Sequence, residues 1–273
     1  MTTPVDGGDR DIISCLPAEC LAQIISLTSP ADACRSAAVS HSFQSIADSD
    51  DVWKSFLPSD HEDILSGTTS WPELSALSKK ELYLRLCDNP VIINSNQNMS
   101  FALERQSGKK CYMVGARGLA IIWGDTPTYW TWTNLPESRF REVAELRYVW
   151  WFDIKGRIGT RMLSPATNYA AYLVFKFARN RKGFSPKAMD LRVHLEDSIA
   201  EQGRKLVILD PADGVPKPYQ EREDGWLEIE IGEFFNDTGD DGTLLCSLME
   251  TDGRFAKVGL IVDGIEFRPK NNI

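Results

Sequence analysis

The sequence lacks the features that mark several large classes of protein. No apolar stretch reaches the roughly 18 residues that a membrane-spanning helix needs, and the opening residues, MTTPVDGGDRD, lack the basic-then-apolar order of a secretory signal. Lys and Arg number 30 against 39 Asp and Glu, so the net charge is −9 and no basic surplus is available for nucleic acid. We therefore expect no membrane or nucleic-acid partner, and we predict that the chain acts in the cytoplasm and nucleus.

Side chains for metal or covalent chemistry are also sparse. The three histidines are far apart in the sequence, and the six cysteines include no CxxC pair, so we expect no metal site and reduced thiols. Neither a G-x-S-x-G motif nor a glycine-rich phosphate loop occurs, so we expect no cofactor and no catalytic residue. An alternative function is that of a glycoside hydrolase. Glu228 and Glu230 share one face of a predicted strand, and such enzymes use paired carboxylates.

After ten residues that we predict to be disordered, residues 11–57 carry the patterns of a small helical domain. Leu21, Ile24 and Ile25 recur at the spacing of one helix face, and Ser29 to Asp32 is a capping sequence that begins a second helix. The apolar residues of the later helices are Phe43 and Ile46, then Val52, Trp53 and Phe56. A unit this small cannot bury all of its apolar side chains, so one face is expected to bind another protein.

The pattern changes at about residue 91. Residues 58–90 form a partly helical connector, in which Ser78 to Glu81 is another capping box. Beyond it, strands are predicted at 148–154, 169–177, 191–195 and 227–231. Five Asp-Gly pairs after residue 200, the last of them Asp263-Gly264, are expected to make tight reversals. These features predict an antiparallel β-sandwich, so the fold class is a small helical domain followed by an all-β domain.

The run WGDTPTYWTW, residues 123–132, is the strongest indication of a ligand site. It places four large aromatic residues around a turn sequence. Flat rings beside a loop can stack on the C–H face of a sugar while the sugar hydroxyls form hydrogen bonds. We predict that Trp123 and Trp130 flank the turn as two walls of that site, the alternative being that the aromatics only fill a small core. The other tryptophans of the β region are expected to pack in the sandwich: Trp132, Trp150, Trp151 and Trp226.

The helical region resembles a known docking domain. Leu16-Pro17, the P-x-D sequence at Pro30, Val39-Ser40 and Val52-Trp53 follow the order of the F-box, which docks substrate receptors onto the Skp1 adaptor of cullin-based ubiquitin ligases. The resemblance assigns the F-box to residues 11–57. It implies that the adaptor contacts Leu16, Pro17, Leu21, Ile24, Ile25, Pro30, Asp32, Val39 and Phe43.

The β region resembles the phloem protein 2 family, also called Nictaba-like lectins. The segments that carry the resemblance are WGDTPTYWTW, EVAELRYVWWFDIKGRI, NYAAYLVFKF, DGWLEIEIGEFF and GLIVDGIEFRP. Behind an F-box, this domain is similar to the plant F-box proteins of the PP2-B type. The resemblance implies a jelly-roll-like β-sandwich over residues 91–273 that binds N-acetylglucosamine oligomers and N-glycan cores without a metal. It implies carbohydrate contacts from Trp123, Tyr129, Trp130 and Glu250, while Thr243 stands where the family lectin has a carboxylate.

Taken together, the sequence predicts a non-catalytic substrate receptor of a Skp1–cullin–F-box ubiquitin ligase that binds a glycan on its target proteins. An alternative keeps the adaptor role and replaces the glycan by a protein surface. Whether the sandwich forms homodimers stays open.

Overall fold

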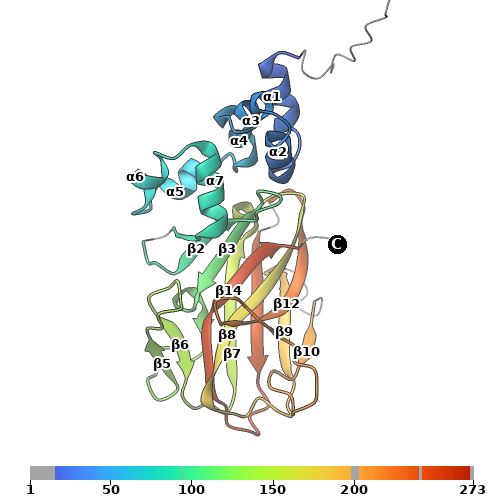
Figure 1. Cartoon of the computed structure of the whole chain (residues 1–273). Helices are drawn as coiled ribbons and strands as arrows, with labels where there is room; N and C mark the ends of the chain where they lie inside the picture. The colour runs from blue at the N-terminus through green and yellow to red at the C-terminus, as the bar shows by residue number, and fades with distance from the viewer. Residues whose placement is uncertain (1–15, 94, 198–202, 240–241, 271–273) are drawn as a thin grey trace, which may run out of the picture.

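Helices occupy the first third of the chain, and strands form two antiparallel sheets beyond them (Figure 1). This computed structural model describes residues 16–93, 95–197, 203–239 and 242–270. The predicted disordered segment 1–10 and the first residues of the predicted F-box lie outside the described residues. Within these ranges, no helix is long and apolar enough to cross a bilayer.

The helices begin where the capping sequences predict. Ser29 accepts a hydrogen bond from the Asp32 amide at 3.1 Å, and Ser78 and Glu81 form a complete capping box. Both caps confirm the sequence prediction, because each satisfies an amide that has no partner inside its helix. The helices are α1 (Ala18–Ser26), α2 (Pro30–Ala37), α3 (His41–Ala47), α4 (Asp50–Phe56), α5 (His61–Ser66), α6 (Trp71–Leu74) and α7 (Lys79–Asp88).

The strands divide between two sheets. The first sheet has the order β1-β2-β3-β14-β8-β12-β11, with β6 paired to both β14 and β5, and the second has the order β10-β9-β13-β7-β4. The strands are β1 (Val91–Ile92), β2 (Met99–Leu103), β3 (Lys110–Gly115), β4 (Ala120–Ile121), β5 (Trp130–Thr133), β6 (Val143–Leu146), β7 (Phe152–Gly159), β8 (Thr167–Lys182), β9 (Met189–Leu195), β10 (Lys205–Val207), β11 (Gln220–Glu221), β12 (Leu227–Asn236), β13 (Thr243–Glu250) and β14 (Val258–Pro269). Short 3-10 turns, η2 (Ala116–Gly118) and η3 (Thr160–Met162), follow β3 and β7.

The two sheets pack face to face, as the sequence predicted. A Cβ atom on Gly156 of β7 would lie 2.8 Å from the side chain of Ile265 on β14, so glycine permits a close approach of the sheets there. Strand β8 lies between β14 and β12, and its apolar residues are buried on both faces. This confirms the prediction of a central strand covered on both sides.

The helical region is joined to the sandwich through aromatic residues. Trp53 of α4 is fully buried, and its ring contacts Tyr83 of α7 with centroids 5.2 Å apart. The Tyr83 hydroxyl donates a hydrogen bond to the Arg105 carbonyl, in the turn between β2 and β3, at 2.9 Å. Gly108 in the same turn has φ +68°, and a Cβ atom there would lie 2.5 Å from the Phe56 carbonyl oxygen. The helices and the sandwich therefore share one continuous apolar core.

A second, smaller apolar cluster lies on the other face of the first sheet. Met113 and Val174 belong to it, and they alternate along their strands with residues of the main core. The loop of residues 134–142 supplies Phe140, whose ring packs against this face. Trp226 is buried in the same cluster and donates its Nε1–H to the Glu137 carbonyl at 3.2 Å. The prediction that Trp226 packs in the sandwich domain is thus confirmed, on the outer face of its first sheet.

The structure corrects one predicted reversal. Asp263 and Gly264 lie inside β14, where the register shifts and the strand changes its partner from β6 to β3. Glycine is needed there because a Cβ atom would lie 2.3 Å from the Val114 carbonyl oxygen. Asp263 itself is buried, and its carboxylate accepts a hydrogen bond from the Ser138 hydroxyl at 2.6 Å.

A second correction concerns the alternating segment from Tyr148 to Ile154. Strand β7 begins only at Phe152, and the four residues before it form a loop held by a single β-bridge between Val149 and Lys257. The alternating pattern in the sequence therefore begins four residues before the strand does. Trp150, which was expected to pack in the sandwich, is 51% exposed.

We predict that Asp263→Asn stabilises the protein at neutral pH. Burial raises the pKa of the Asp263 carboxyl from 3.8 to about 6, so its neutral form favours folding below pH 4 and this contribution is lost between pH 4 and pH 6. At pH 7 the variant is expected to gain roughly 2–3 kcal/mol in the free energy of unfolding, because asparagine accepts the Ser138 hydrogen bond without a charge. Urea unfolding at pH 7 and pH 4 measures this difference. A gain that is equal at both pH values would contradict the assignment.

Candidate adaptor surface and ligand site

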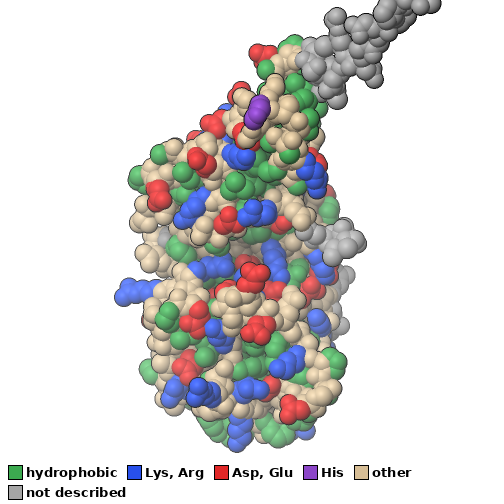
Figure 2. Space-filling model, viewed as in Figure 1, with side chains coloured by type: hydrophobic (Ala, Val, Ile, Leu, Met, Phe, Trp, Pro, Cys, Tyr) green, Lys and Arg blue, Asp and Glu red, His purple; other side chains and the backbone are tan. Residues whose placement is uncertain are grey.

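An apolar groove lies between α1 and α3 at the far end of the helical region. Its volume is about 420 Å³, and Figure 2 shows hydrophobic side chains at the surface of this end of the molecule. The residues that line it are Leu16, Ala18, Leu21, Val39, Ser40, Ser42, Phe43 and Ile46. Val39 is 68% exposed, and Ile24 on α1 and Leu27, the residue after α1, are also exposed. Several large apolar side chains open to solvent on so small a region indicate a surface that another protein covers.

The predicted adaptor contacts divide into two groups. Leu16, Pro17, Ile24 and Val39 are exposed and Phe43 is half-buried, so these five can be touched by a partner. The other four have contacts within the helical region: Leu21, Ile25 and Pro30 are buried, and the half-exposed Asp32 accepts the Ser29 hydroxyl at 2.7 Å. Burial takes Ile25 and Pro30 away from direct adaptor contact, whereas Leu21 forms part of the groove wall. Adaptor contact by the half-exposed Asp32 stays a prediction.

Aromatic side chains gather on two loops at the opposite end of the sandwich. The ring of Trp123, in the loop after β4, contacts Tyr129 with centroids 5.4 Å apart and Trp151 with centroids 4.4 Å apart. In the loop before β7, Tyr148 and Trp150 form an edge-to-face pair with centroids 6.1 Å apart, and both are exposed. We call these five residues the aromatic cluster. Sequence reasoning missed Tyr148, Trp150 and Trp151, because their alternation with apolar residues is also typical of a strand.

Trp123 also carries backbone strain. Its φ of 57° lies in the left-handed region, which is uncommon for a bulky side chain and costs on the order of 1–2 kcal/mol. Its side chain is 38% exposed, so packing alone does not account for the conformation. Strain of this kind gathers at functional sites, and it supports Trp123 as a ligand contact.

The structure corrects the predicted role of Trp130. This residue is the first of β5 and is 1% exposed, so its ring belongs to the core and cannot stack on a ligand. Trp132, two residues later on the same face, is half-buried and donates its Nε1–H to the Gly124 carbonyl at 2.9 Å. The guanidinium of Arg117 lies 3.7 Å from the Trp132 ring centroid. The turn is therefore flanked by Trp123 and Tyr129, whereas Trp130 lies beneath it.

Glu250 likewise differs from the prediction of a direct sugar contact. Its side chain is buried and forms an ion pair with Lys257, and it accepts a hydrogen bond from the Asp252 amide at 2.9 Å. Thr243 lies at the other end of β13, next to Gly159. Glu250 is therefore linked to the loop of the aromatic cluster through Lys257, whose ammonium donates to the Trp150 carbonyl at 2.7 Å.

The paired carboxylates of β12 are held by cations. Burial opposes the charge on Glu228, but hydrogen bonds from Arg268 and the nearby Arg222 keep the pKa of its carboxyl below the usual value. Glu230 forms an ion pair with Lys270 at 3.0 Å. A glycosidase needs one carboxylic acid whose pKa is raised so that it can donate a proton, which is the reverse of the Glu228 environment.

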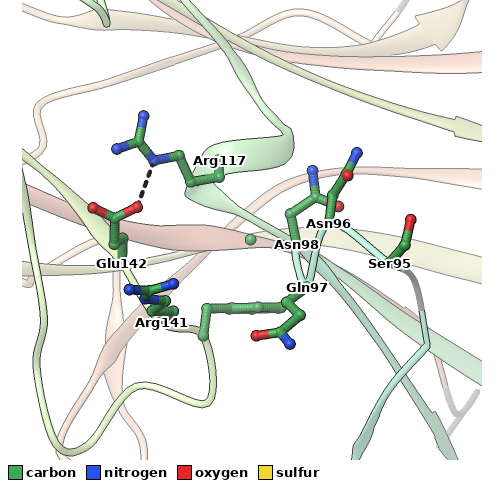
Figure 3. A pocket seen from close by; sticks show the side chains of 9 residues that line it. Ser95, Asn96, Gln97, Asn98, Arg117, Arg141 and Glu142 are labelled. Carbon is green, nitrogen blue, oxygen red and sulfur yellow. Dashed lines mark hydrogen bonds and ion pairs between the residues drawn. The ribbon is translucent and has the colours of Figure 1, made fainter. Parts of the chain in front are cut away.

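A polar pocket of about 480 Å³ lies on the side of the sandwich, between the turn before β2, η2 and the loop before β6 (Figure 3). Its walls carry side-chain amides, a hydroxyl, two guanidinium groups and one carboxylate, from Ser95, Asn96, Gln97, Asn98, Arg117, Arg141 and Glu142. Arg117 donates to Glu142 at 2.9 Å across it. Its wall has no exposed aromatic ring, so it differs from the aromatic cluster in chemistry.

The phloem protein 2 family matches residues 109–269, and the F-box-like family matches residues 13–59. The chain belongs to the phloem protein 2 family. The F-box-like match precedes the phloem protein 2 match, and relatives of the chain include PP2-B F-box proteins, which confirms the resemblance seen in the sequence.

Two relatives from Arabidopsis thaliana match nearly the whole chain. F-box protein PP2-B10 is 46% identical over 260 residues, which cover 93% of this chain and 92% of the relative. F-box protein PP2-B1 is 38% identical over a gapped alignment of 307 positions, which covers 94% of this chain and 90% of the relative.

Solved structures match the sandwich only distantly. A family 35 carbohydrate binding module from Clostridium thermocellum has a TM-score of 0.30 at 11% identity, covering 57% of this chain and 96% of the module. A Podospora anserina β-(1,4)-mannanase with a CBM35 module has a TM-score of 0.35 at 9% identity, covering 60% of this chain and 28% of the enzyme.

We predict that Trp130→Ala destabilises this family member far more than Trp123→Ala. Removal of the buried Trp130 ring leaves a cavity and is expected to cost about 3–5 kcal/mol, whereas removal of the exposed Trp123 ring is expected to cost less than about 1.5 kcal/mol. Urea unfolding of the two variants, followed by circular dichroism, measures the difference. Equal destabilisation by the two substitutions would contradict the placement of Trp130 in the core.

Proposed function

We propose that the chain is the substrate-recognition subunit of a Skp1–cullin–F-box ubiquitin ligase, and that its sandwich binds N-acetylglucosamine-containing or N-glycan carbohydrate on target proteins. The observation that carries the proposal is the presence of two exposed apolar surfaces at opposite ends of one continuous structure. The groove on α1 and α3 is the adaptor surface, and the aromatic cluster is the ligand site.

The arrangement of the strands supports this division of roles. Strand β7 runs from Phe152, next to the aromatic cluster, to Gly159 and η3. Beyond η3, Ser164 accepts a hydrogen bond from the Lys110 amide at 3.0 Å, and the Lys110 ammonium contacts the Asp60 carboxylate, just after α4, at 2.9 Å. The cluster is therefore the part of the sandwich that points away from the ligase, where a target can be held.

Aromatic faces suit a neutral sugar. Each exposed ring contributes about 0.5–1.5 kcal/mol beyond burial, so a single sugar residue on Trp123 or Trp150 is expected to bind weakly. Longer or clustered glycans gain affinity because several contacts form at a high effective concentration. A homodimer formed through the sandwich would also raise the affinity for clustered glycans, because it would carry two ligand sites.

As a receptor the protein is not itself an enzyme, and transfer of ubiquitin is left to the cullin-bound partners. We place its action in the cytoplasm and nucleus. The described cysteines are free thiols, and two of them, Cys20 and Cys34, are exposed, which fits a reducing compartment.

A second candidate function keeps the adaptor role but replaces the glycan by a protein surface. The polar pocket of Figure 3 favours it, because side-chain amides and guanidinium groups are suited to pair with the peptide groups and carboxylates of a protein.

We predict that Val39→Asp weakens binding to a Skp1-type adaptor about a hundredfold, because a charge is placed on the exposed apolar surface that the adaptor covers. The matched control is Val215→Asp, which makes the same change at an exposed valine of the sandwich domain. Calorimetric titration with the adaptor compares the two variants, which are both expected to keep the native melting temperature. Equal adaptor affinities for both variants would remove the support for this docking surface.

We predict that Trp150→Ala abolishes binding of a trimer of β-1,4-linked N-acetylglucosamine and of a high-mannose N-glycan while the melting temperature changes little. The control is Phe235→Ala, since Phe235 is an exposed aromatic on β12 outside the cluster. Calorimetric titration with both glycans measures binding. Absence of binding by the native protein would reject the glycan and leave the protein-target candidate.

A further inference from the structure

Lys257 is one of the most deeply buried charged residues that the structure describes. Only 1% of its surface is exposed, although it lies in the segment that connects β13 to β14. Its backbone pairs in both directions with Val149, whose amide donates to the Lys257 carbonyl at 3.1 Å and whose carbonyl accepts from the Lys257 amide at 2.7 Å. The residue thus lies directly behind the loop that carries Tyr148 and Trp150.

The Lys257 ammonium is satisfied by groups from two other segments. It forms an ion pair with the buried carboxylate of Glu250, at the end of β13, and donates a hydrogen bond to the Trp150 carbonyl at 2.7 Å. Glu250 pairs in register with Phe152, the first residue of β7. A buried ammonium is costly unless it is both paired and hydrogen-bonded, so this arrangement holds the three segments in one relative position.

We propose that Lys257 and Glu250 are positioning residues, which fix the loop of residues 147–151 and so hold the Tyr148 and Trp150 rings ready to receive the glycan. This inference rests on the proposed glycan function. The proposal also assigns a role to Glu250. Its carboxylate is buried and cannot touch a ligand, but it can act on the ligand site by holding the Lys257 ammonium. A site whose rings are held in place before binding avoids the cost of ordering them.

The surrounding charges make the arrangement sensitive to pH. The ionisable groups on the segments around Lys257 come from β13 and the turn after it, the segment before β9, the loop itself and the start of β7. They are Glu250, Asp252, Arg254, Lys187, Arg147, Tyr148 and Asp153. Burial, assisted by Lys187, lowers the pKa of Lys257 to about 8. Loss of this proton removes the ion pair in the folded protein, so glycan affinity is expected to fall as the pH rises from 7 to 9.

The experiment compares Lys257→Met with the double variant Lys257→Met/Glu250→Gln in the full chain. The single variant leaves a buried carboxylate unpaired and is expected to lose stability, whereas the double variant removes both charges and is expected to recover most of it. Affinity for the N-acetylglucosamine trimer should stay about tenfold below that of the native protein in the double variant, because the rings must then be ordered on binding. Its affinity should also no longer change between pH 7 and pH 9. Lys205→Met, at an exposed lysine on β10, serves as the control.

Recovery of both stability and native affinity in the double variant would overturn the proposal, since the pair would then contribute only to folding. Hydrogen–deuterium exchange of residues 147–151 separates this proposal from the glycan function. If the native protein binds no glycan, the proposed function fails. The positioning role then stands only if amide exchange in this loop is faster in the double variant than in the native protein, and it fails if the rates are equal.

Discussion

The buried contact between Trp53 and Tyr83 is the interaction on which the arrangement of the whole molecule depends. Tyr83 is held at one side by the Trp53 ring and at the other by the carbonyl of Arg105, so the last helix is bound to both the helical region and the sandwich. The helical region is too small to fold around a full core of its own. By sharing its core with the sandwich, it can leave the groove on α1 and α3 uncovered without losing its fold.

The sandwich separates the two surfaces that the protein offers. Strand β7 has eight residues between the aromatic cluster and the end near the helices, and at about 3.3 Å per residue it spans roughly 25 Å. The helices at one end and the loops at the other are therefore separated by a stiff sheet rather than by a flexible linker (Figure 1). For a ligase receptor, such stiffness would present a bound target in a constant direction relative to the adaptor.

Local signals in the sequence predicted the caps at Ser29 and Ser78, the central strand β8 and the two-part fold, because each depends on near neighbours or on a simple period. The errors arose where distant segments decide the outcome. Asp263-Gly264 has the composition of a turn. It is instead a bulge inside β14, because β14 pairs with β6 before this point and with β3 after it. Trp130 and Trp150 have similar neighbours in sequence, and only the β5–β6 pairing and the Val149–Lys257 bridge bury one ring and expose the other.

Charge burial links the aromatic cluster to the strands behind it. Loops that carry exposed rings have few apolar contacts of their own, so their position must be set by the groups beneath them. Here that support comes from the buried Val149 side chain of the loop and from an ammonium on Lys257, which has the Glu250 carboxylate and the Trp150 carbonyl as its partners. An apolar residue in place of Lys257 could fill the same space, but it could not hold a backbone carbonyl in one direction. The cost of burying the charge is therefore consistent with a need for a defined loop rather than with a need for stability.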